Sequence, residues 1–147
     1  MATACNTLYT LHILVAIYQQ MKIFNYFFCF VFVVFAALQY NDPDPYLWMP
    51  IYLYTAVLCF LAARHKFYPK AYLTGIIVYA AYAVYKVFDQ NGLLDWIKLH
   101  HAENIAETMK AQKPWIEESR EFFGLMILIS VLLIDWVYAK RTKKKII

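Results

Sequence analysis

The chain has 147 residues, of which 63% are hydrophobic and 16% are charged, and its formal net charge is +4. Soluble domains usually contain about 45–50% apolar residues. Here the excess lies in long continuous runs, which argues against a soluble domain and predicts a membrane protein. The positive charge flanks these runs, where it can contact anionic lipid, so it does not indicate a nucleic-acid partner.

The N-terminal segment, residues 1–22, allows several interpretations. Leu8–Tyr18 is apolar, but about 11 residues are too few to cross a bilayer. Two glutamines and Lys22 then interrupt the run. We consider an interfacial helix, an extension of the first span, and an addition upstream of a start at Met21.

Four later runs are long and apolar enough to cross a bilayer as helices. We expect these spans at about 23–40, 47–63, 71–88 and 121–138, with a basic tail over 141–147. The predicted fold class is therefore all-α: an integral membrane four-helix bundle. The lipid bilayer is its first expected partner.

A polar corner separates the first two spans. Each of Asp42 and Asp44 precedes a proline, which disfavours helical geometry at the preceding residue. Asn41 also favours a turn, because its side chain can bond nearby backbone amides. Trp48 follows at the start of the next span, where an aromatic residue suits the membrane interface. We expect a tight, ordered corner here.

The one sizeable extramembrane segment is expected between spans three and four, over residues 89–119. Apolar residues repeat at helical spacing from Leu99 to Met109, with polar residues on the other face. This pattern predicts an amphipathic helix that lies on the membrane surface or caps the bundle.

This segment also holds the weak candidates for a metal site, His100, Glu103 and Glu107, with His101 in reserve. Imidazole and carboxylate groups suit zinc. However, His-His-x-Glu is not a specific spacing, and adjacent histidines point about 100° apart on a helix. The sequence also has no phosphate loop, dinucleotide fingerprint or nucleophile–base motif. We therefore predict no metal and no cofactor.

The charges predict an orientation in the membrane. With four spans, Lys22, the stretch 64–70 and the closing basic cluster fall on one side, while nine of the ten acidic residues fall on the other. Basic residues gather in cytoplasmic loops of membrane proteins. We therefore expect a multi-pass protein with both termini in the cytoplasm, in the inner membrane if it is bacterial.

A second polar motif opens the fourth span. Glu117, Arg120, Glu121 and Gly124 share one helical face, and a cation is not favoured near a helix N-terminus. We therefore expect Arg120 to have a specific partner, such as Asp44 or its neighbour Asp42. This contact would be either a structural clasp or a ligand site. For Lys86 the alternatives are pairing with Asp89 or Glu121, and extension toward the interface, which we favour. The cluster that we single out comprises Asn41, Asp42, Asp44, Trp48, Lys86, Glu117, Glu118, Arg120, Glu121 and Gly124.

Two motifs together resemble a known family. Asn-Asp-Pro-Asp-x-x-x-Trp-Met-x-x-Tyr over 41–52 and Glu-Glu-x-Arg-Glu-x-x-Gly-Leu-x-Ile over 117–127 resemble the signatures of the transmembrane protein 220 family. The resemblance covers about 23–138 and implies a small multi-span membrane protein whose activity is not established. It implies no catalytic role for the signature residues. The surface helix has no counterpart in the family signatures, so the resemblance gives no support to a metal-binding role for His100.

Three functions are compatible with these patterns. The first is a non-enzymatic accessory subunit of a membrane complex, which would bind other membrane proteins through its aromatic surface or its outer helix. The second is a small transporter or ligand-binding protein that uses the acidic and arginine cluster. The third is a metal-dependent membrane enzyme. We favour the first.

Overall fold

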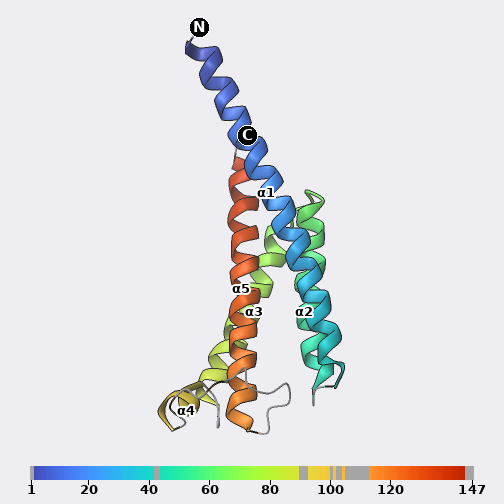
Figure 1. Ribbon diagram of the computed structural model, residues 1–147, viewed down its shortest axis with the longest axis vertical. Coiled ribbons are helices and arrows are strands. Elements are labelled where there is room, and N and C mark those ends of the chain that lie inside the picture. The colour runs from blue at the N-terminus through green and yellow to red at the C-terminus, as the bar shows by residue number, and fades with distance from the viewer. Residues whose placement is uncertain are drawn as a thin grey trace. The chain divides into compact units, whose positions relative to one another are not determined.

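The computed structural model describes residues 2–41, 44–89, 93–99, 101, 104 and 113–144. Helices dominate these residues, and no strand occurs among them. In chain order the elements are α1 (Ala2–Leu38), the short 3₁₀ helix η1 (Gln39–Asn41), α2 (Pro45–Ala63), α3 (Pro69–Phe88), α4 (Leu93–Lys98) and α5 (Pro114–Lys144) (Figure 1). In the described part of the chain, four helices are long and apolar enough to cross a membrane. The predicted all-α membrane fold is confirmed.

Three of these helices begin at a proline: α2 at Pro45, α3 at Pro69 and α5 at Pro114. Proline suits the first helical position because its fixed φ matches the helix and the amide it lacks would be unpaired there. The proline after each polar connection therefore sets where the following span starts.

Two spans are longer than the hydropathy pattern predicted. The first helix, α1, runs without interruption from Ala2 to Leu38. The last, α5, begins at Pro114, so the motif at its start lies inside the helix. Between the spans, α4 ends at Lys98, and Leu99 and His101 lie in turns. The expected surface helix therefore does not begin at Leu99, and most of its remaining residues lie outside the described ranges.

Pro50 lies inside α2, beyond its first turn, because the helix begins at Pro45. Because proline has no amide hydrogen, it cannot bond the carbonyl of Tyr46 one turn earlier.

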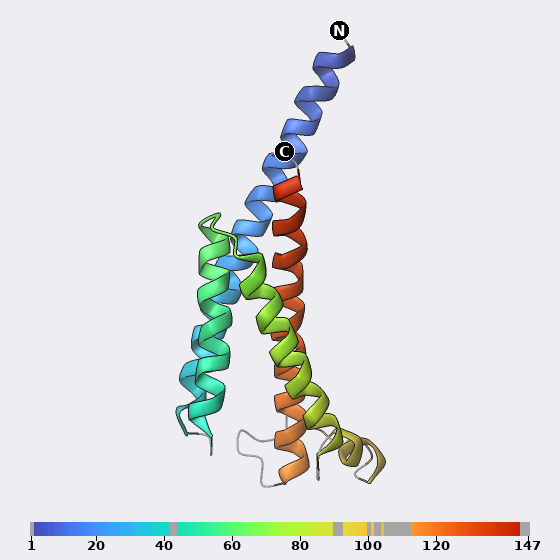
Figure 2. The same ribbon diagram turned by 180° about the vertical axis from the view of Figure 1, so that it is seen from behind.

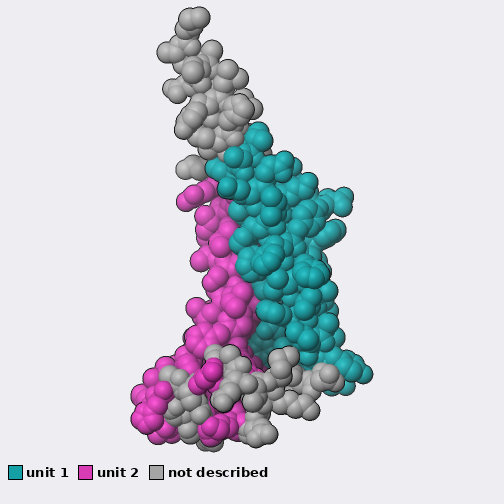
Figure 3. All heavy atoms as spheres, viewed as in Figure 1, with its two compact units in different colours: residues 1–68 teal, residues 69–147 magenta. Residues whose placement is uncertain are grey.

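The chain forms two compact units, residues 1–68 and residues 69–147 (Figure 3). In the first unit, α1 and α2 pack against each other (Figure 1). Their contact is rich in aromatic side chains: the ring of Tyr52 on α2 lies 6.4 Å from that of Phe32 and 5.7 Å from that of Phe35, both on α1. Asn25, Phe32 and Ala36, which share one stripe of α1, are all buried.

In the second unit, α3 and α5 lie side by side (Figure 2). The buried residues of α3 are Tyr72, Gly75, Tyr79, Ala83 and Lys86. Gly75 is a site where the neighbouring helix can approach closely, as is common between helices in membranes. The short α4 packs against both helices, and its Trp96 meets Phe123 of α5 edge to face at 6.1 Å.

Short polar side chains within the spans bond to their own helices. Thr55 donates to the carbonyl of Ile51 at 3.3 Å, and Ser130 donates to that of Met126 at 2.7 Å. Such bonds to the preceding turn satisfy the hydroxyl donor in an apolar environment.

Candidate functional site

The candidate site lies in the second unit, where the end of α3 meets the start of α5. Lys86 is in the last turn of α3, where the backbone dipole favours a cation. Glu118 and Glu121 lie three residues apart near the start of α5, so their side chains leave the same face of the helix. The two helix ends therefore bring one ammonium group and two carboxylates together.

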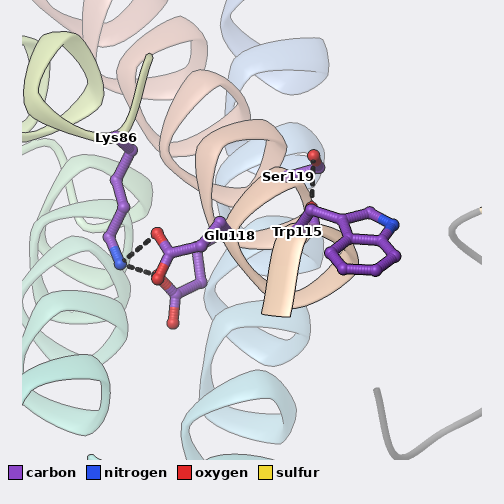
Figure 4. A network of polar contacts seen from close by, with 5 residues as sticks. Lys86, Trp115, Glu118 and Ser119 are labelled. Carbon is purple, nitrogen blue, oxygen red and sulfur yellow. Dashed lines mark hydrogen bonds and ion pairs between the residues drawn. The ribbon is translucent and has the colours of Figure 1, made fainter. Parts of the chain in front are cut away.

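Lys86 pairs with both carboxylates. Its Nζ lies 2.7 Å from Oε2 of Glu118 (Figure 4). The same Nζ also pairs with Oε2 of Glu121. The exposed fractions of the side chains are 7% for Lys86, 23% for Glu118 and 14% for Glu121. Removing one partner of an ion pair so shielded from water is costly, because the remaining charge is left without its counterion.

The charges within this trio do not balance. Two carboxylates face one ammonium group, so the fully ionised trio carries a net charge of −1. Ionisable groups in such a partly dehydrated place can take up a proton or bind a cation. The trio can therefore either fasten the two helices together or exchange a small positive species.

Aromatic residues complete the surroundings of Lys86. Its ammonium group lies 5.4 Å from the centre of the Tyr82 ring, within the range of a cation–π interaction. Asp89, the first residue after α3, accepts a hydrogen bond from Tyr85. Tyr82 thus contacts the ammonium group of Lys86, and Tyr85 bonds to the carboxylate of Asp89.

The structure changes one prediction here and supports its alternative. We favoured a Lys86 side chain that extends toward the interface, but Lys86 is buried, so that prediction was wrong. Pairing with Glu121 was the alternative, and the structure has this contact. Glu118 was not foreseen as a partner, although its spacing from Glu121 was a signal that could have revealed it.

Other residues of the predicted cluster are distributed over both units. Glu117, Arg120 and Gly124 are half-buried on α5. Asp44 lies directly before α2 in the first unit, and its side chain makes no capping bond. Pairing between Arg120 and Asp44 therefore stays a prediction.

The remaining members belong to the corner before α2. Trp48 is 2% exposed and packs beside Tyr52, so it serves the core of the first unit. Asn41 ends η1, but its side chain lies outside the described part of the structure. Asp42 lies outside the described residues altogether.

The metal hypothesis rests on residues that the structure largely leaves out. His100, Glu103 and Glu107 lie outside the described ranges. His101 is exposed in a turn. Among the described residues, no three metal-ligating side chains come together.

Sequence reasoning gave too little weight to Asp135. This carboxylate is completely buried on α5, and Tyr72 is completely buried on α3. Tyr72 precedes Lys86 by as many residues as Asp135 follows Glu121. In an antiparallel helix pair with Lys86 beside Glu121, this spacing places Tyr72 and Asp135 at the same level.

A family model described as Transmembrane family 220, helix, matches residues 31–137. The chain belongs to this family.

The family match covers both signature motifs, and with them Lys86, Glu118 and Glu121. It leaves most of α1 and the basic tail outside. No curated protein and no solved structure matches the chain. Membership of the Transmembrane 220 family thus agrees with the helical membrane architecture and assigns no chemistry to the trio.

Proposed function

We propose that this Transmembrane 220 family protein is a non-enzymatic accessory subunit of a membrane complex. In this role its helices bind other membrane proteins through their outward aromatic and aliphatic faces. The bilayer surrounds whatever part of those faces the partners leave open.

One observation carries this proposal: Lys86 and its carboxylate partners are shielded within their own unit, whereas many large apolar side chains of the spans are exposed. Lys86 is paired with two carboxylates of its own unit. On α1, by contrast, Phe27 and Phe30 are 59% and 69% exposed. Aromatic residues are enriched in protein interfaces because they bury a large area at little entropic cost.

The test is isolation of the tagged full chain from its native membrane in a mild detergent. The proposal expects a defined complex with fixed stoichiometry, larger than the chain with its detergent. Phe30→Ala should reduce the amount of bound partner while leaving the melting temperature of the isolated chain unchanged. Phe32→Ala is the matched control, because Phe32 is fully buried and its loss should lower the melting temperature. A chain that purifies only by itself contradicts the proposal.

The unbalanced trio favours a second candidate function, a small transporter or ion-binding protein. Ionisable groups within membrane helices often mark the path of a proton or ion, and the trio has one carboxylate in excess. In proteoliposomes, such a protein would dissipate a proton or cation gradient, and Glu121→Gln would abolish that flux. An absence of flux across proton, sodium and potassium gradients would contradict this candidate.

We further propose that both termini lie in the cytoplasm. The basic residues Lys22, Arg64, Lys66 and Lys70 support this orientation through the positive-inside rule. The proposal fixes the side on which each end of every span emerges, so labelling from one side of the membrane tests it.

A further inference from the structure

The connection after α2 holds a group of residues that the proposed function does not use. Tyr18 of α1 stacks on His65, with the ring centres 3.9 Å apart and the planes 4° from parallel. Lys22, one turn further along α1, acts electrostatically on the same imidazole. Arg64 and Lys66 flank His65 in the chain, and both are exposed. All five residues belong to the first unit.

The backbone holds this connection in a defined form. The amide of Lys66 donates to the carbonyl of Leu61 at 2.8 Å, and the amide of His65 donates to that of Ala62 at 2.9 Å. This pair of bonds is a Schellman motif, which closes the C-terminus of α2. His65 occupies its left-handed position with φ of 60°, where glycine is usual. The amides at 65 and 66 are thus engaged by the helix, while the cationic side chains on either side of His65 stay exposed.

Charge in this unit is separated along α2. The only carboxylates of residues 1–68 are Asp42 and Asp44, which come before α2, whereas Arg64 and Lys66 follow it. No acidic residue therefore lies in the connection after α2 that could neutralise Arg64 and Lys66. Among the described residues, Nε2 of His65 is buried and has no hydrogen-bond partner.

The position of the group indicates what neutralises it. The apolar span of α2 ends at Ala63, so Arg64 is the first residue beyond the span. Cationic side chains directly after a membrane helix reach the level of the lipid headgroups, and tyrosine is favoured at the same level. The anions present there in quantity are lipid phosphates.

From this arrangement we propose that Lys22, Arg64, His65 and Lys66 form a binding site for the headgroup of an anionic phospholipid. The cations neutralise the phosphate of the headgroup, and Tyr18 holds the imidazole beside them by stacking. This site is independent of the proposed subunit role, because it needs only the bilayer.

The first experiment measures lipid binding to the purified full chain by native mass spectrometry, with phosphatidylglycerol and phosphatidylcholine as probes. Each cation near a membrane surface contributes about 1 kcal/mol to the attraction of anionic lipid. The double variant Arg64→Gln with Lys66→Gln should therefore weaken phosphatidylglycerol binding by roughly 10- to 30-fold. Phosphatidylcholine binding should stay unchanged.

The matched control removes the same charge elsewhere. Lys98 and Lys113 are both exposed and lie in the second unit, and Lys98→Gln with Lys113→Gln should change phosphatidylglycerol binding less than twofold. An equal loss in both double variants would reduce the effect to net charge and overturn the site. Equal affinity of the native chain for the two lipids would also overturn it.

The second experiment follows His65 itself, by imidazole ¹⁵N NMR as a function of pH in phosphatidylcholine nanodiscs. Burial and the charge of Lys22 lower the pKa of His65. The neighbouring groups are Tyr18 and Lys22 on α1 and Arg64 and Lys66 in the connection. Phosphatidylglycerol in the nanodisc should raise this pKa, because the headgroup stabilises the imidazolium. His65→Asn assigns the resonance.

An unchanged pKa with phosphatidylglycerol would contradict the proposal. A third arm adds millimolar inorganic phosphate to nanodiscs without anionic lipid. A pKa increase there equal to that with phosphatidylglycerol would identify a site for soluble phosphate and overturn the lipid assignment. If inorganic phosphate alone does not raise the pKa of His65, the result supports the headgroup site.

Discussion

Lys86 Nζ lies 2.7 Å from Glu118 Oε2, and this contact joins the last turn of one candidate span to the first turns of another. The same ammonium group also contacts Glu121. Separation of the two helices here would leave charges in a place that water reaches poorly. The trio thus fixes how the end of α3 meets the start of α5.

Replacing Lys86 with methionine should destabilise the protein. The variant keeps the volume of the side chain but leaves two carboxylates without their cation, and loss of one partner of a buried pair is strongly destabilising. We expect a loss of about 2–3 kcal/mol in unfolding free energy in detergent. Glu118→Gln should cost less than Lys86→Met, because Glu121 remains to pair with the lysine.

Lys98→Met is the control for this measurement. It removes the same charge from an exposed position on α4 and should leave the unfolding free energy unchanged. If Lys86→Met unfolds at the same denaturant concentration as the native chain, the trio does not hold the helices together.

Trp48→Ala should destabilise the first unit. The indole is 2% exposed and lies beside Tyr52, so its removal opens a cavity. Truncating a large aromatic residue in a soluble core costs about 3–5 kcal/mol. We expect about 2 kcal/mol here, because lipid solvates the exposed apolar groups of the unfolded chain better than water does. Tyr46→Ala, at a position 93% exposed, should have little effect, and equal thermal shifts would refute the packing role.

Tyr72 and Asp135 should be energetically coupled. Both are completely buried, and the register set by Lys86 and Glu121 places them at one level of the helix pair. A double-mutant cycle with Tyr72→Phe and Asp135→Asn should give a coupling of about 1 kcal/mol. Strictly additive changes would show that the two groups do not interact.

His65 should make the stability of the first unit depend on pH. Burial and Lys22 lower the pKa of this imidazole in the folded chain, so the unfolded chain binds its proton more readily. Stability is therefore complete above the unfolded pKa of about 6.5 and decreases as the pH falls below it. Melting in a neutral detergent from pH 8 to pH 5 should show this decrease. His65→Asn, which tolerates the left-handed backbone, should reduce the slope, and an unchanged slope would exclude His65 as its source.

Much of the fold could be predicted from the sequence, because apolar runs bounded by Pro45 and Pro69 mark spans with little ambiguity. The extent of α1 and α5 could not. Polar residues such as Lys22 and Glu117 end an apolar run without ending the helix, since a helix can continue into water. Hydropathy thus locates the membrane part of a helix, but not its termini.

The candidate site was predicted only in part. Helical spacing grouped Glu121 with Arg120 on one face of the helix, and pairing with Glu121 was one of the alternatives for Lys86. It could not decide between a paired lysine and one that extends to the interface, because that choice depends on how close α3 and α5 lie. The role of His65 could not be predicted for a different reason. Its left-handed backbone results from the way α2 ends, and no local sequence motif indicates it.

The account as a whole rests on four membrane crossings with acidic and basic ends on opposite sides. The most direct test is single-cysteine labelling in sealed membranes, in a chain whose native cysteines are replaced by serine. Probes at positions 46 and 113 should react with a membrane-impermeant reagent from the outside, whereas a probe at position 66 should react only after the membrane is opened. If positions 46 and 113 are labelled from opposite sides, the four-span topology is wrong.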